Sequence, residues 1–329
     1  MEHMILIPEA QAAGALSMRD CLAAVRSAFI ACAEGRSYPT ERIAMPLASE
    51  RNSCQWLSAI CLEPPFFGTK FSAVFPGNTQ HGLPCDQSTI SLYSLETGEQ
   101  LALIGANYLT ALKTGAGAGT ATDLLARPDA ARLGIIGTGT QAFTQVLAIQ
   151  EVRALDELRI YDMSPARMQA FAKRVSAVRN RPYDIRLCGS AEECVRGADI
   201  LCTATPSRTP VFDADALQPG THINAIGSFT PYMQELPEGA VVKAAFAVTE
   251  HTEGLWAAAG DILTPLDKGL ITRDKVRGSV GDLLTRKIEG RRSSEEITLY
   301  ESVGSCVLDM AIAIAVYGKC RGTAEQASH

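Results

Sequence analysis

A glycine-rich turn between a predicted strand and a predicted helix is the feature that most constrains the fold of this chain. Residues 133–136 are predicted to form a short buried strand, and Gly137, Gly139 and Ala142 follow it in the spacing G-x-G-x-x-A. The first glycine permits a tight turn, the second leaves space for a pyrophosphate, and the small third residue keeps the helix close to the strand. The free amides and positive dipole end of the helix favour phosphate charge. The stretch therefore predicts a dinucleotide-binding unit.

An acidic residue at the end of the next predicted strand supports this interpretation. Asp162 follows the strand at 158–161, about 20 residues after the loop, where a carboxylate would accept hydrogen bonds from both ribose hydroxyls. A carboxylate there disfavours the additional 2′-phosphate of NADP, so we expect NAD, although the neighbouring Arg167 leaves NADP open. The alternative roles for Asp162 are a solvated turn residue or the N-cap of the next helix.

Strands and helices alternate along the chain after this unit. The predicted helices cover residues 140–153 and 166–179, and the second carries an apolar stripe at helical spacing. Further short apolar segments are predicted as strands, at residues 185–187, 200–203, 223–226 and 246–249. Such alternation predicts an α/β domain with a Rossmann-type, doubly wound parallel sheet and helices on both faces.

The first hundred residues have a different pattern, which is typical of an α+β domain. Ser17 and Asp20 form a capping-box pattern at the start of a helix that ends near Gly35. Five short apolar runs then indicate strands, at residues 43–47, 55–62, 69–75, 89–94 and 101–104. Residues 105–126 are rich in glycine and alanine and predict a closely packed helix that joins two domains. The tail at 302–318 is predicted to be a helix that packs on the first domain.

Composition and charge exclude several classes of protein. The 329 residues suffice for about two domains, and 47% of them are apolar. The net charge of −6 argues against a nucleic-acid partner, which would need a basic face. No apolar run approaches the roughly 20 residues that span a bilayer, and the N-terminus lacks the features of a signal peptide. We therefore expect a cytoplasmic protein without a membrane partner.

The cysteines and histidines do not indicate a metal site. None of the ten cysteines forms a C-x-x-C pair, and several lie in apolar stretches, as Cys202 does. The five histidines show no pair at the i, i+4 spacing of helical metal ligands. We expect reduced, buried thiols and no bound metal.

Three cations of the first domain are candidates for a substrate site: Arg42, Lys70 and Lys113. Each would ordinarily be a solvated surface charge. However, Lys70 lies between apolar residues of a predicted strand, and Lys113 adjoins the small-residue helix that leads into the nucleotide domain. Together the three would suit a small substrate that carries a carboxylate.

Several segments together resemble the ornithine cyclodeaminase/μ-crystallin family. They span about residues 40–312 in the family's order: Gly68-Thr69-Lys70 with Phe75-Pro76-Gly77-Asn78, Gly82-Leu83-Pro84, residues 109–114, the Gly137 loop, residues 223–227 with Glu235-Leu236, and Ser302-Val303-Gly304 with Asp309. The resemblance implies a homodimer. It assigns residues 1–114 and 305–329 to a substrate-binding and dimerisation domain, and residues 115–304 to the dinucleotide-binding domain.

The resemblance also implies roles for individual residues. Arg42, Lys70 and Lys113 match positions that hold the substrate carboxylate, and Lys70 is the candidate catalytic proton donor. The predicted cofactor contacts are Thr114, Gly137, Thr138, Gly139, Thr140, Gln141, Asp162, Thr203, Ala225, Ile226, Gly227, Ser228, Ser302 and Val303. Of these, the last two match positions beside the nicotinamide.

Four positions depart from the family pattern. Lys113 stands where the family has arginine, which keeps the charge but loses the planar guanidinium fork. Phe229 stands where ornithine cyclodeaminases carry the aspartate that acts as acid and base, and phenylalanine cannot transfer a proton. Met233 and Cys85 replace a lysine and a threonine of the family.

The loss of the aspartate favours the reductive half of the family's chemistry. Oxidation of an amine needs a base, whereas reduction of an imine needs mainly a bound carboxylate and a correctly placed dihydronicotinamide. We expect an NAD(P)H-dependent reductase of a small cyclic imino acid, either Δ1-pyrroline-2-carboxylate or Δ1-piperideine-2-carboxylate, giving proline or pipecolate. The alternatives are an ornithine cyclodeaminase with another residue in place of the aspartate, an alanine or other amino-acid dehydrogenase, and a μ-crystallin-like binding protein.

Overall fold

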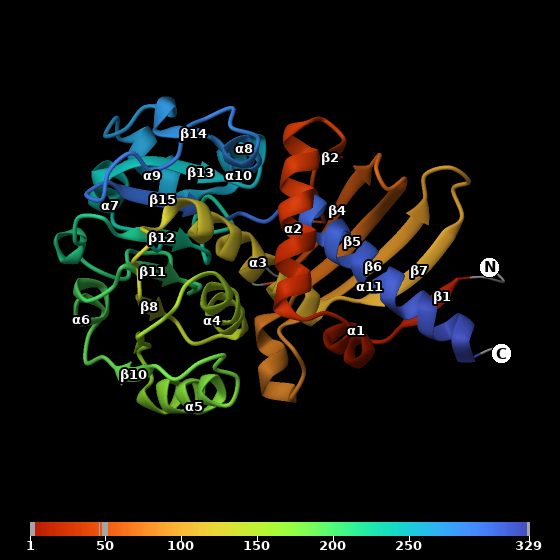
Figure 1. Cartoon of the computed structure of the whole chain (residues 1–329), viewed down its shortest axis with the longest axis horizontal. Helices are drawn as coiled ribbons and strands as arrows, with labels where there is room; N and C mark the ends of the chain where they lie inside the picture. The colour runs from red at the N-terminus through yellow and green to blue at the C-terminus, as the bar shows by residue number, and fades with distance from the viewer. Residues whose placement is uncertain (1–3, 46, 48–51, 328–329) are drawn as a thin grey trace. The chain divides into compact units, whose positions relative to one another are not determined.

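The computed structural model describes residues 4–45, 47 and 52–327 (Figure 1). The chain divides into two compact units: unit 1 comprises residues 1–113 and 305–329, and unit 2 comprises residues 114–304. The division falls one residue before the predicted boundary, and the roles assigned to the two domains remain predictions. Helix α3 (Asn107–Leu125) is continuous across the division, in the segment where the sequence predicts a joining helix.

Unit 1 contains a sheet in which the described strands have the order β1-β7-β6-β5-β4-β2, with β3 paired to β4. The strands are β1 (Ile5–Ile7), β2 (Ser37–Pro39), β3 (Ile43–Met45), β4 (Ser53–Cys61), β5 (Phe66–Val74), β6 (Asp86–Ser94) and β7 (Gln100–Gly105). All described pairs are antiparallel except β1 with β7. All five predicted strands are present, although residue 46 of the first lies outside the described residues; β1 and β2 have three residues each, too few to give a periodic signal.

Helices cover one face of this sheet. They are α1 (Glu9–Ala15), α2 (Met18–Ala33) and the C-terminal α11 (Cys306–Ala327). Helix α11 packs against α2 and across β4, β5 and β6, as Figure 1 shows. The predicted capping box is present at α2, where the Ser17 Oγ accepts from the N–H of Asp20 at 3.2 Å and the Asp20 carboxylate accepts from the N–H of Ser17 at 2.9 Å.

The C-terminal helix begins four residues later than predicted. Ser302 still extends the neighbouring sheet, because its N–H donates to the carbonyl of Ala225 at 2.9 Å. Gly304 then adopts φ +81°, which lies outside the helical region, and the helix starts at Cys306. The predicted packing of this helix on the sheet of the first domain is confirmed.

Unit 2 contains a parallel sheet in the order β10-β9-β8-β11-β12-β15-β13-β14. The strands are β8 (Arg132–Ile136), β9 (Glu157–Tyr161), β10 (Asp184–Leu187), β11 (Ile200–Thr203), β12 (His222–Ala225), β13 (Ala244–Thr249), β14 (Val276–Ser279) and β15 (Ile297–Glu301). The strand order reverses between β8 and β11, where an open parallel sheet forms its ligand crevice. The predicted Rossmann-type sheet is therefore confirmed.

Helices cover both faces of the sheet in unit 2. Successive residues of a strand therefore point into two separate apolar cores, one on each face. Ile200 and Cys202 belong to the core beneath α4 (Thr140–Val152) and α5 (Pro165–Ser176), whereas Leu201 between them belongs to the core on the other face. The other helices of unit 2 are α6 (Ala191–Arg196), α7 (Glu238–Lys243), α8 (Thr252–Ala258), α9 (Gly260–Asp267) and α10 (Val280–Leu284).

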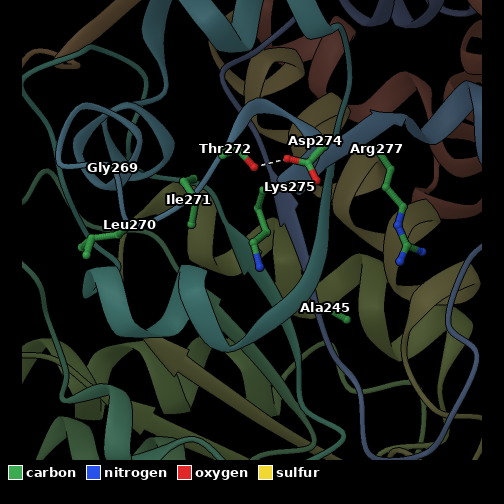
Figure 2. Close-up of a pocket in the computed structure, with 8 residues that line it drawn as sticks. All are labelled: Ala245, Gly269, Leu270, Ile271, Thr272, Asp274, Lys275 and Arg277. Atoms are coloured by element: carbon green, nitrogen blue, oxygen red, sulfur yellow. Dashed lines mark hydrogen bonds between the residues drawn. The ribbon is translucent and has the colours of Figure 1, made fainter.

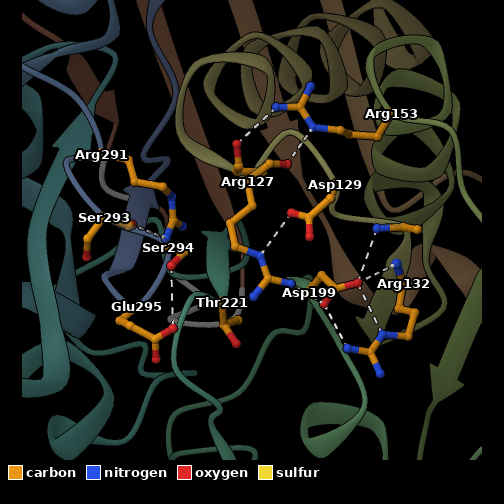
Figure 3. Close-up of polar contacts among 12 residues, drawn as sticks. Arg127, Asp129, Arg132, Arg153, Asp199, Thr221, Arg291, Ser293, Ser294 and Glu295 are labelled. Atoms are coloured by element: carbon orange, nitrogen blue, oxygen red, sulfur yellow. Dashed lines mark hydrogen bonds and ion pairs between the residues drawn. The ribbon is translucent and has the colours of Figure 1, made fainter.

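A polar network closes the amino-terminal edge of this sheet (Figure 3). The Asp199 carboxylate accepts hydrogen bonds from the N–H groups of Ala131 and Arg132 at 3.1 and 3.0 Å, and it pairs with the side chains of Arg127 and Arg132 at 2.8 and 2.9 Å. Arg153 donates to carbonyl oxygens at the carboxyl end of α3. These contacts fix α3 to the sheet and leave the opposite edge for a ligand.

Neither disulfide bonds nor membrane-spanning helices are found among the residues that the structure describes. All ten cysteines are free. Within the described ranges, no helix is both long enough and apolar enough to cross a membrane.

Candidate active site

The carboxyl ends of the parallel strands form one rim of the sheet in unit 2. The register aligns the last residues of these strands in a row across the sheet: Tyr161, Ile136, Thr203, Ala225, Glu301 and Thr249. The residues that follow them therefore lie along the rim: Asp162, Gly137, Ala204, Ile226, Ser302 and Glu250. The topology thus brings predicted cofactor residues from five separate segments to one edge.

The glycine loop follows β8 on this rim. Gly137 has φ +92°, and a Cβ at this position would lie 2.5 Å from the carbonyl oxygen of Ala204, so no larger residue fits without strain. Gly139, by contrast, has ordinary extended backbone, and no neighbouring atom lies within 4 Å of where its Cβ would be. Ala142 is fully buried. The tight turn, the open space and the close helix contact are all present.

Asp162 binds the glycine loop. Its Oδ2 accepts hydrogen bonds from the N–H and the hydroxyl of Thr138 at 3.1 and 2.6 Å, and its Oδ1 accepts from the N–H of Ser164 at 3.0 Å. Ser164, not Asp162, is the N-cap of α5. The exposed Arg167 places its Nε 3.9 Å from the same carboxylate. The geometry therefore sets an acid and a cation side by side where the ribose is expected.

The remaining predicted cofactor residues differ in exposure. Thr203, Ala225, Ile226, Ser228, Ser302 and Val303 are buried, whereas Thr114 and Gln141 are half-buried and Thr140 is exposed. Two of them hold the loop after β12: the N–H of Gly227 donates to Glu235 at 2.6 Å, and the hydroxyl of Ser228 donates to the carbonyl of Met233 at 2.9 Å.

These residues fit a dinucleotide. The amino end of α4 has no side-chain cap, so its first N–H groups remain available to a phosphate. The position beside Gly139 is open. The Oε1 of Gln141 is buried and has no hydrogen-bond partner within the described part of the chain, which is typical of a group that awaits a ligand.

Buried carboxyl groups support this rim, and the sequence analysis did not predict them as site residues. Glu235 accepts from the N–H of Thr205 at 2.6 Å and from Gly227, while Asp261 accepts from the N–H groups of Glu235 and Leu236 at 2.7 and 2.8 Å. Only one of the buried acids, Glu250, could have been predicted from neighbouring residues in the sequence. It directly follows a predicted strand, as Asp162 does.

Glu250 and Glu301 complete this set. Glu250 accepts hydrogen bonds from the hydroxyl of Ser302 and the N–H of Val303, so it holds both residues that are expected beside the nicotinamide. Glu301 is fully buried, and neither of its oxygens has a partner among the residues that the structure describes. In these ranges, no three histidine, cysteine or acidic side chains are placed to hold a metal ion.

The surroundings favour the neutral form of three of these acids. Burial raises the pKa of Glu235 above its ordinary value, although its hydrogen bonds with Thr205 and Gly227 oppose the effect. Burial, followed by the charges of Asp261, Glu235 and Glu250, raises the pKa of Glu301 well above its ordinary value. Burial and the charge of Glu235 raise the pKa of Asp261 to about 8. All three shifts favour the protonated carboxyl group over the carboxylate under the rim of unit 2.

Two of the three predicted substrate cations meet in unit 1. The Nζ of Lys70, on β5, lies 3.0 Å from one carboxylate oxygen of Asp309, and the Nζ of Lys113, on α3, lies 2.8 Å from the other. Lys113 also donates to the carbonyl of Ser305 at 3.1 Å. All three charged side chains are at least 95% buried. We call Lys70, Lys113 and Asp309 the lysine–aspartate cluster.

The local structure explains why this cluster forms. Gly68, Lys70 and Ser72 alternate along β5 on its buried face. A Cβ on Gly68 would lie 2.5 Å from the sulfur of Met310, so the missing side chain lets α11 approach the strand closely. Asp309, which precedes Met310 in the first turn of α11, is thereby brought to Lys70. Asp309 belongs to the segments that resemble the family, but its local sequence does not indicate a role for it.

Burial and mutual charge determine the protonation of the cluster. Burial lowers the pKa of Lys70, the neighbouring charge of Lys113 lowers it further, and the charge and hydrogen bond of Asp309 oppose both effects. Burial alone would raise the pKa of Asp309, but the charges of Lys113 and Lys70 outweigh it and the pKa lies below its ordinary value. With both lysines protonated, the cluster carries one positive charge in excess of its carboxylate.

The third predicted cation and the other three departures from the family pattern lie outside this cluster. Arg42 occupies an exposed position just before β3 and remains a predicted substrate contact. Phe229, in the loop after β12, is 39% exposed, and Met233 in the same loop is buried. Cys85 is half-buried between η1 (Pro76–His81) and β6.

A pocket in unit 2 lies away from this rim (Figure 2). It measures about 440 Å³ and is lined by Ala245 and by residues of the segment 269–277, which precede or begin β14. Lys275 in this pocket donates to the carbonyls of Val242 and Ala244 at 3.2 and 2.7 Å, at the carboxyl end of α7. The lysine thus stabilises a helix end, and the pocket contains none of the predicted site residues.

Comparison with known proteins identifies the family. The sequence pattern of the ornithine cyclodeaminase/mu-crystallin family matches residues 1–324. This chain belongs to that family. The resemblance inferred from the sequence is therefore confirmed over nearly the whole chain.

Members of the family similar to this chain include both reductases and dehydrogenases. A Δ(1)-pyrroline-2-carboxylate reductase of Bacillus cereus is 34% identical over 325 residues, which cover 98% of this chain and 99% of that protein. The Thermococcus litoralis Δ(1)-pyrroline-2-carboxylate reductase, solved in complex with NADH and L-proline, is 30% identical with a TM-score of 0.94, and the match covers 98% of both chains. An archaeal alanine dehydrogenase dimer with bound NAD is 32% identical with a TM-score of 0.91 and covers 97% of both chains.

Proposed function

We propose that this chain is an NAD(P)H-dependent reductase of a small cyclic imino acid. Its substrate is Δ1-pyrroline-2-carboxylate, with the six-membered Δ1-piperideine-2-carboxylate as the related alternative, and the products are proline and pipecolate. The observation that carries the proposal is that the two reductases described above match this chain over almost its full length. The lysine–aspartate cluster and the glycine loop supply the groups that this reaction needs.

Cofactor binding is assigned to the rim of unit 2. The amides of the glycine loop and of α4 would hold the pyrophosphate, and Asp162 would accept hydrogen bonds from the adenosine ribose. When bound, the reduced nicotinamide supplies a hydride. Ser302 and Val303, fixed by Glu250, would lie beside the nicotinamide. NAD is the expected form because Asp162 occupies the position that a 2′-phosphate would approach, and Arg167 leaves NADP open.

Substrate binding is assigned to unit 1. The excess positive charge of the lysine–aspartate cluster would attract the substrate carboxylate, with Lys113 and Arg42 as its anchors. Lys70 is the proposed proton donor. As the carbon of the C=N bond receives the hydride, the nitrogen receives a proton from the Lys70 Nζ, directly or through one water. The product is the amino acid, and the neutral lysine regains a proton from solvent.

Phe229 separates this proposal from ornithine cyclodeamination. Removal of a proton from the amine of ornithine needs a base at this position, and an aromatic ring cannot accept a proton. Imine reduction has no such requirement. The alanine dehydrogenase relationship favours a second candidate, reductive amination of pyruvate, because that protein is as similar to this chain as the reductases are.

We also propose a homodimer and a cytoplasmic location. The solved alanine dehydrogenase to which this chain is similar is a dimer, which supports the same assembly here. Ten free cysteines suit a reducing compartment. Sedimentation velocity of the full chain tests the dimer, which predicts twice the monomer mass.

The proposal is tested by steady-state oxidation of NADH and NADPH. The purified chain is assayed with Δ1-pyrroline-2-carboxylate, with Δ1-piperideine-2-carboxylate, and with pyruvate plus ammonium. We expect kcat/KM for one of the cyclic imines to exceed that for pyruvate by at least about 100-fold, since a site that anchors and protonates a ring imine is matched to that substrate. A preference for pyruvate would establish the dehydrogenase instead.

A further inference from the structure

The lysine–aspartate cluster contains an acid with no assigned role. Asp309 is 1% exposed, and each of its carboxylate oxygens binds a different ammonium group, at 3.0 Å for Lys70 and 2.8 Å for Lys113. The three side chains come from β5, α3 and α11. A carboxylate shared in this way fixes the separation of the two cations and reduces their repulsion in a buried site.

Among the residues that the structure describes, few other groups act on the Lys70 ammonium. Lys113 repels it from α3, and the buried thiol of Cys306, which donates to the carbonyl of Leu57 at 2.9 Å, lies beside it on α11. Asp86 at the start of β6 also interacts with the charge of Lys70. Burial and Lys113 both favour the neutral amine, and Asp309 is the carboxylate that forms a hydrogen bond to it.

We propose that Asp309 is a positioning residue for imine reduction: it holds Lys70 in its protonated form and in place beside Lys113, so that Lys70 has a proton to donate. The inference rests on the proposed function, in which Lys70 is the proton donor. Because the single negative charge of Asp309 is shared by two ammonium groups, the cluster retains one positive charge for the substrate carboxylate. Asp309 therefore keeps Lys70 protonated without neutralising the positive charge that binds the substrate carboxylate.

The experiment compares the pH dependence of imine reduction in two variants with opposite expected shifts. The rate falls at high pH as Lys70 loses its proton. In Asp309→Asn the remaining effects favour the neutral amine, so this basic limb moves to lower pH by at least about one unit, and the loss of activity is smaller at low pH than at high pH. In Lys113→Met the repulsion between the two ammonium groups is removed, and Asp309 pairs with Lys70 alone. The basic limb therefore moves to higher pH, although KM rises because a substrate anchor is lost.

Asp86→Asn is the matched control, because it removes a carboxylate that acts on Lys70 without a hydrogen bond. We expect a shift in the same direction as in Asp309→Asn but smaller. Equal loss of activity at all pH values in Asp309→Asn would indicate a structural role and overturn the proposal. If Asp309→Asn does not fold, Lys113→Met still decides: a limb that fails to move to higher pH overturns it.

A titration that needs no turnover separates this inference from the proposed function. The ¹³Cε signal of Lys70, assigned by its loss in Lys70→Met, is followed with pH in the full chain. A midpoint lower in Asp309→Asn than in the wild type supports the role of Asp309, and an unchanged midpoint contradicts it. If the midpoint shifts but no cyclic imine is reduced, Asp309 controls Lys70 and the proposed reaction is the part that fails.

Discussion

The lysine–aspartate cluster of unit 1 and the rim of unit 2 treat buried charge in opposite ways. Unit 1 buries two ammonium groups with one carboxylate, and each charge has a partner at 3.0 Å or less. Unit 2 buries Glu235, Glu250, Asp261 and Glu301, and none of the ion pairs described for the chain involves them. Their partners are backbone N–H groups and hydroxyls, or, for Glu301, none within the described residues.

This difference corresponds to two tasks. A charged ligand group needs a site whose own charge is not fully balanced, and the lysine–aspartate cluster meets that need for a carboxylate. A dinucleotide pyrophosphate is expected to bind backbone amides of the glycine loop. The buried carboxyl groups of unit 2 fix other loops of the same rim: Glu235 binds Thr205 and Gly227, and Glu250 binds Ser302 and Val303. Four ionised carboxylates close together would repel the phosphates, and a raised pKa in Asp261 and Glu301 avoids part of that repulsion.

The largest expected effect tests the charged side of this comparison. Lys70→Met removes the proposed proton donor, and kcat/KM for the imine should fall by about 10²–10⁴-fold, the usual contribution of general acid catalysis. Lys319→Met is the control, because Lys319 is exposed on α11 and pairs only with Asp20 among the described ion pairs. A loss of no more than a few-fold in Lys70→Met would remove Lys70 from the mechanism.

A pair of glycine substitutions tests the backbone side. Gly137→Ala should destabilise the fold by about 2–3 kcal/mol, because its φ is +92° and the new Cβ meets the carbonyl of Ala204. Gly139→Ala should leave the thermal unfolding midpoint unchanged, because no atom lies near its Cβ position. It should nevertheless weaken NADH binding by about tenfold or more, since the pyrophosphate needs that space.

Calorimetry and fluorescence titration with NADH measure the two effects separately. Equal destabilisation by both alanines would mean that the open space at Gly139 is filled in the folded chain. Unchanged NADH affinity in Gly139→Ala would place the pyrophosphate elsewhere.

A smaller effect concerns the stability of unit 2 as a function of pH. The pKa of Asp261 is about 8, against an ordinary value of 3.8, so between these values the folded chain keeps a proton that the unfolded chain releases. The free energy of unfolding therefore falls as pH rises through this window. Asp261→Asn keeps the Oδ1 that accepts two backbone N–H groups and should reduce that fall between pH 5 and pH 8 by about 1–3 kcal/mol.

Asp215→Asn is the control for this measurement. The hydrogen bond from Lys243 lowers the pKa of the exposed Asp215, so its titration lies below pH 5 and the variant should show the wild-type slope. Urea unfolding at pH 5, 6, 7 and 8 provides the comparison. A slope in Asp261→Asn equal to that of the wild type would show that Asp261 is ionised in the folded chain.

The smallest expected effect is that of Glu301→Gln. Burial favours the neutral carboxyl group of Glu301, which has no hydrogen-bond partner among the described residues. Glutamine replaces it with a neutral amide of the same shape, so stability at pH 7 should change by less than about 1 kcal/mol. The same substitution at an ionised, paired carboxylate costs more, and Asp309→Asn provides that contrast within one chain. A large loss of stability in Glu301→Gln would mean that the carboxyl group has a partner or a charge that matters.

The sequence predicts those parts of the fold that depend on neighbouring residues. The glycine loop was predicted because three small residues at fixed spacing determine its conformation, and the capping box at Ser17 was predicted for the same reason. Strand β15 was not predicted. It lies between β12 and β13 although it follows both in the chain, so its buried position depends on a crossover that local pattern does not show.

The candidate site likewise contains residues that the local sequence indicates and residues that only the folded chain brings there. Lys70 and Lys113 were chosen from their local surroundings, but Asp309 lies 239 and 196 residues beyond them, and only the packing of α11 on β5 brings it to both. The buried acids of unit 2 were missed because burial of an acid depends on the folded loops around it. Glu250 alone carried a local signal, its position after a predicted strand.

The measurement that tests the central claim most directly is a parallel assay of the purified chain in both directions of the family's chemistry. One sample receives NADH and Δ1-pyrroline-2-carboxylate, the other receives NAD and L-ornithine, and NADH, proline and ammonia are quantified in each. We predict one proline formed for each NADH oxidised in the first sample and no ammonia in the second. Ammonia and proline from ornithine would contradict the account, because another residue would then be replacing the aspartate that is absent at Phe229.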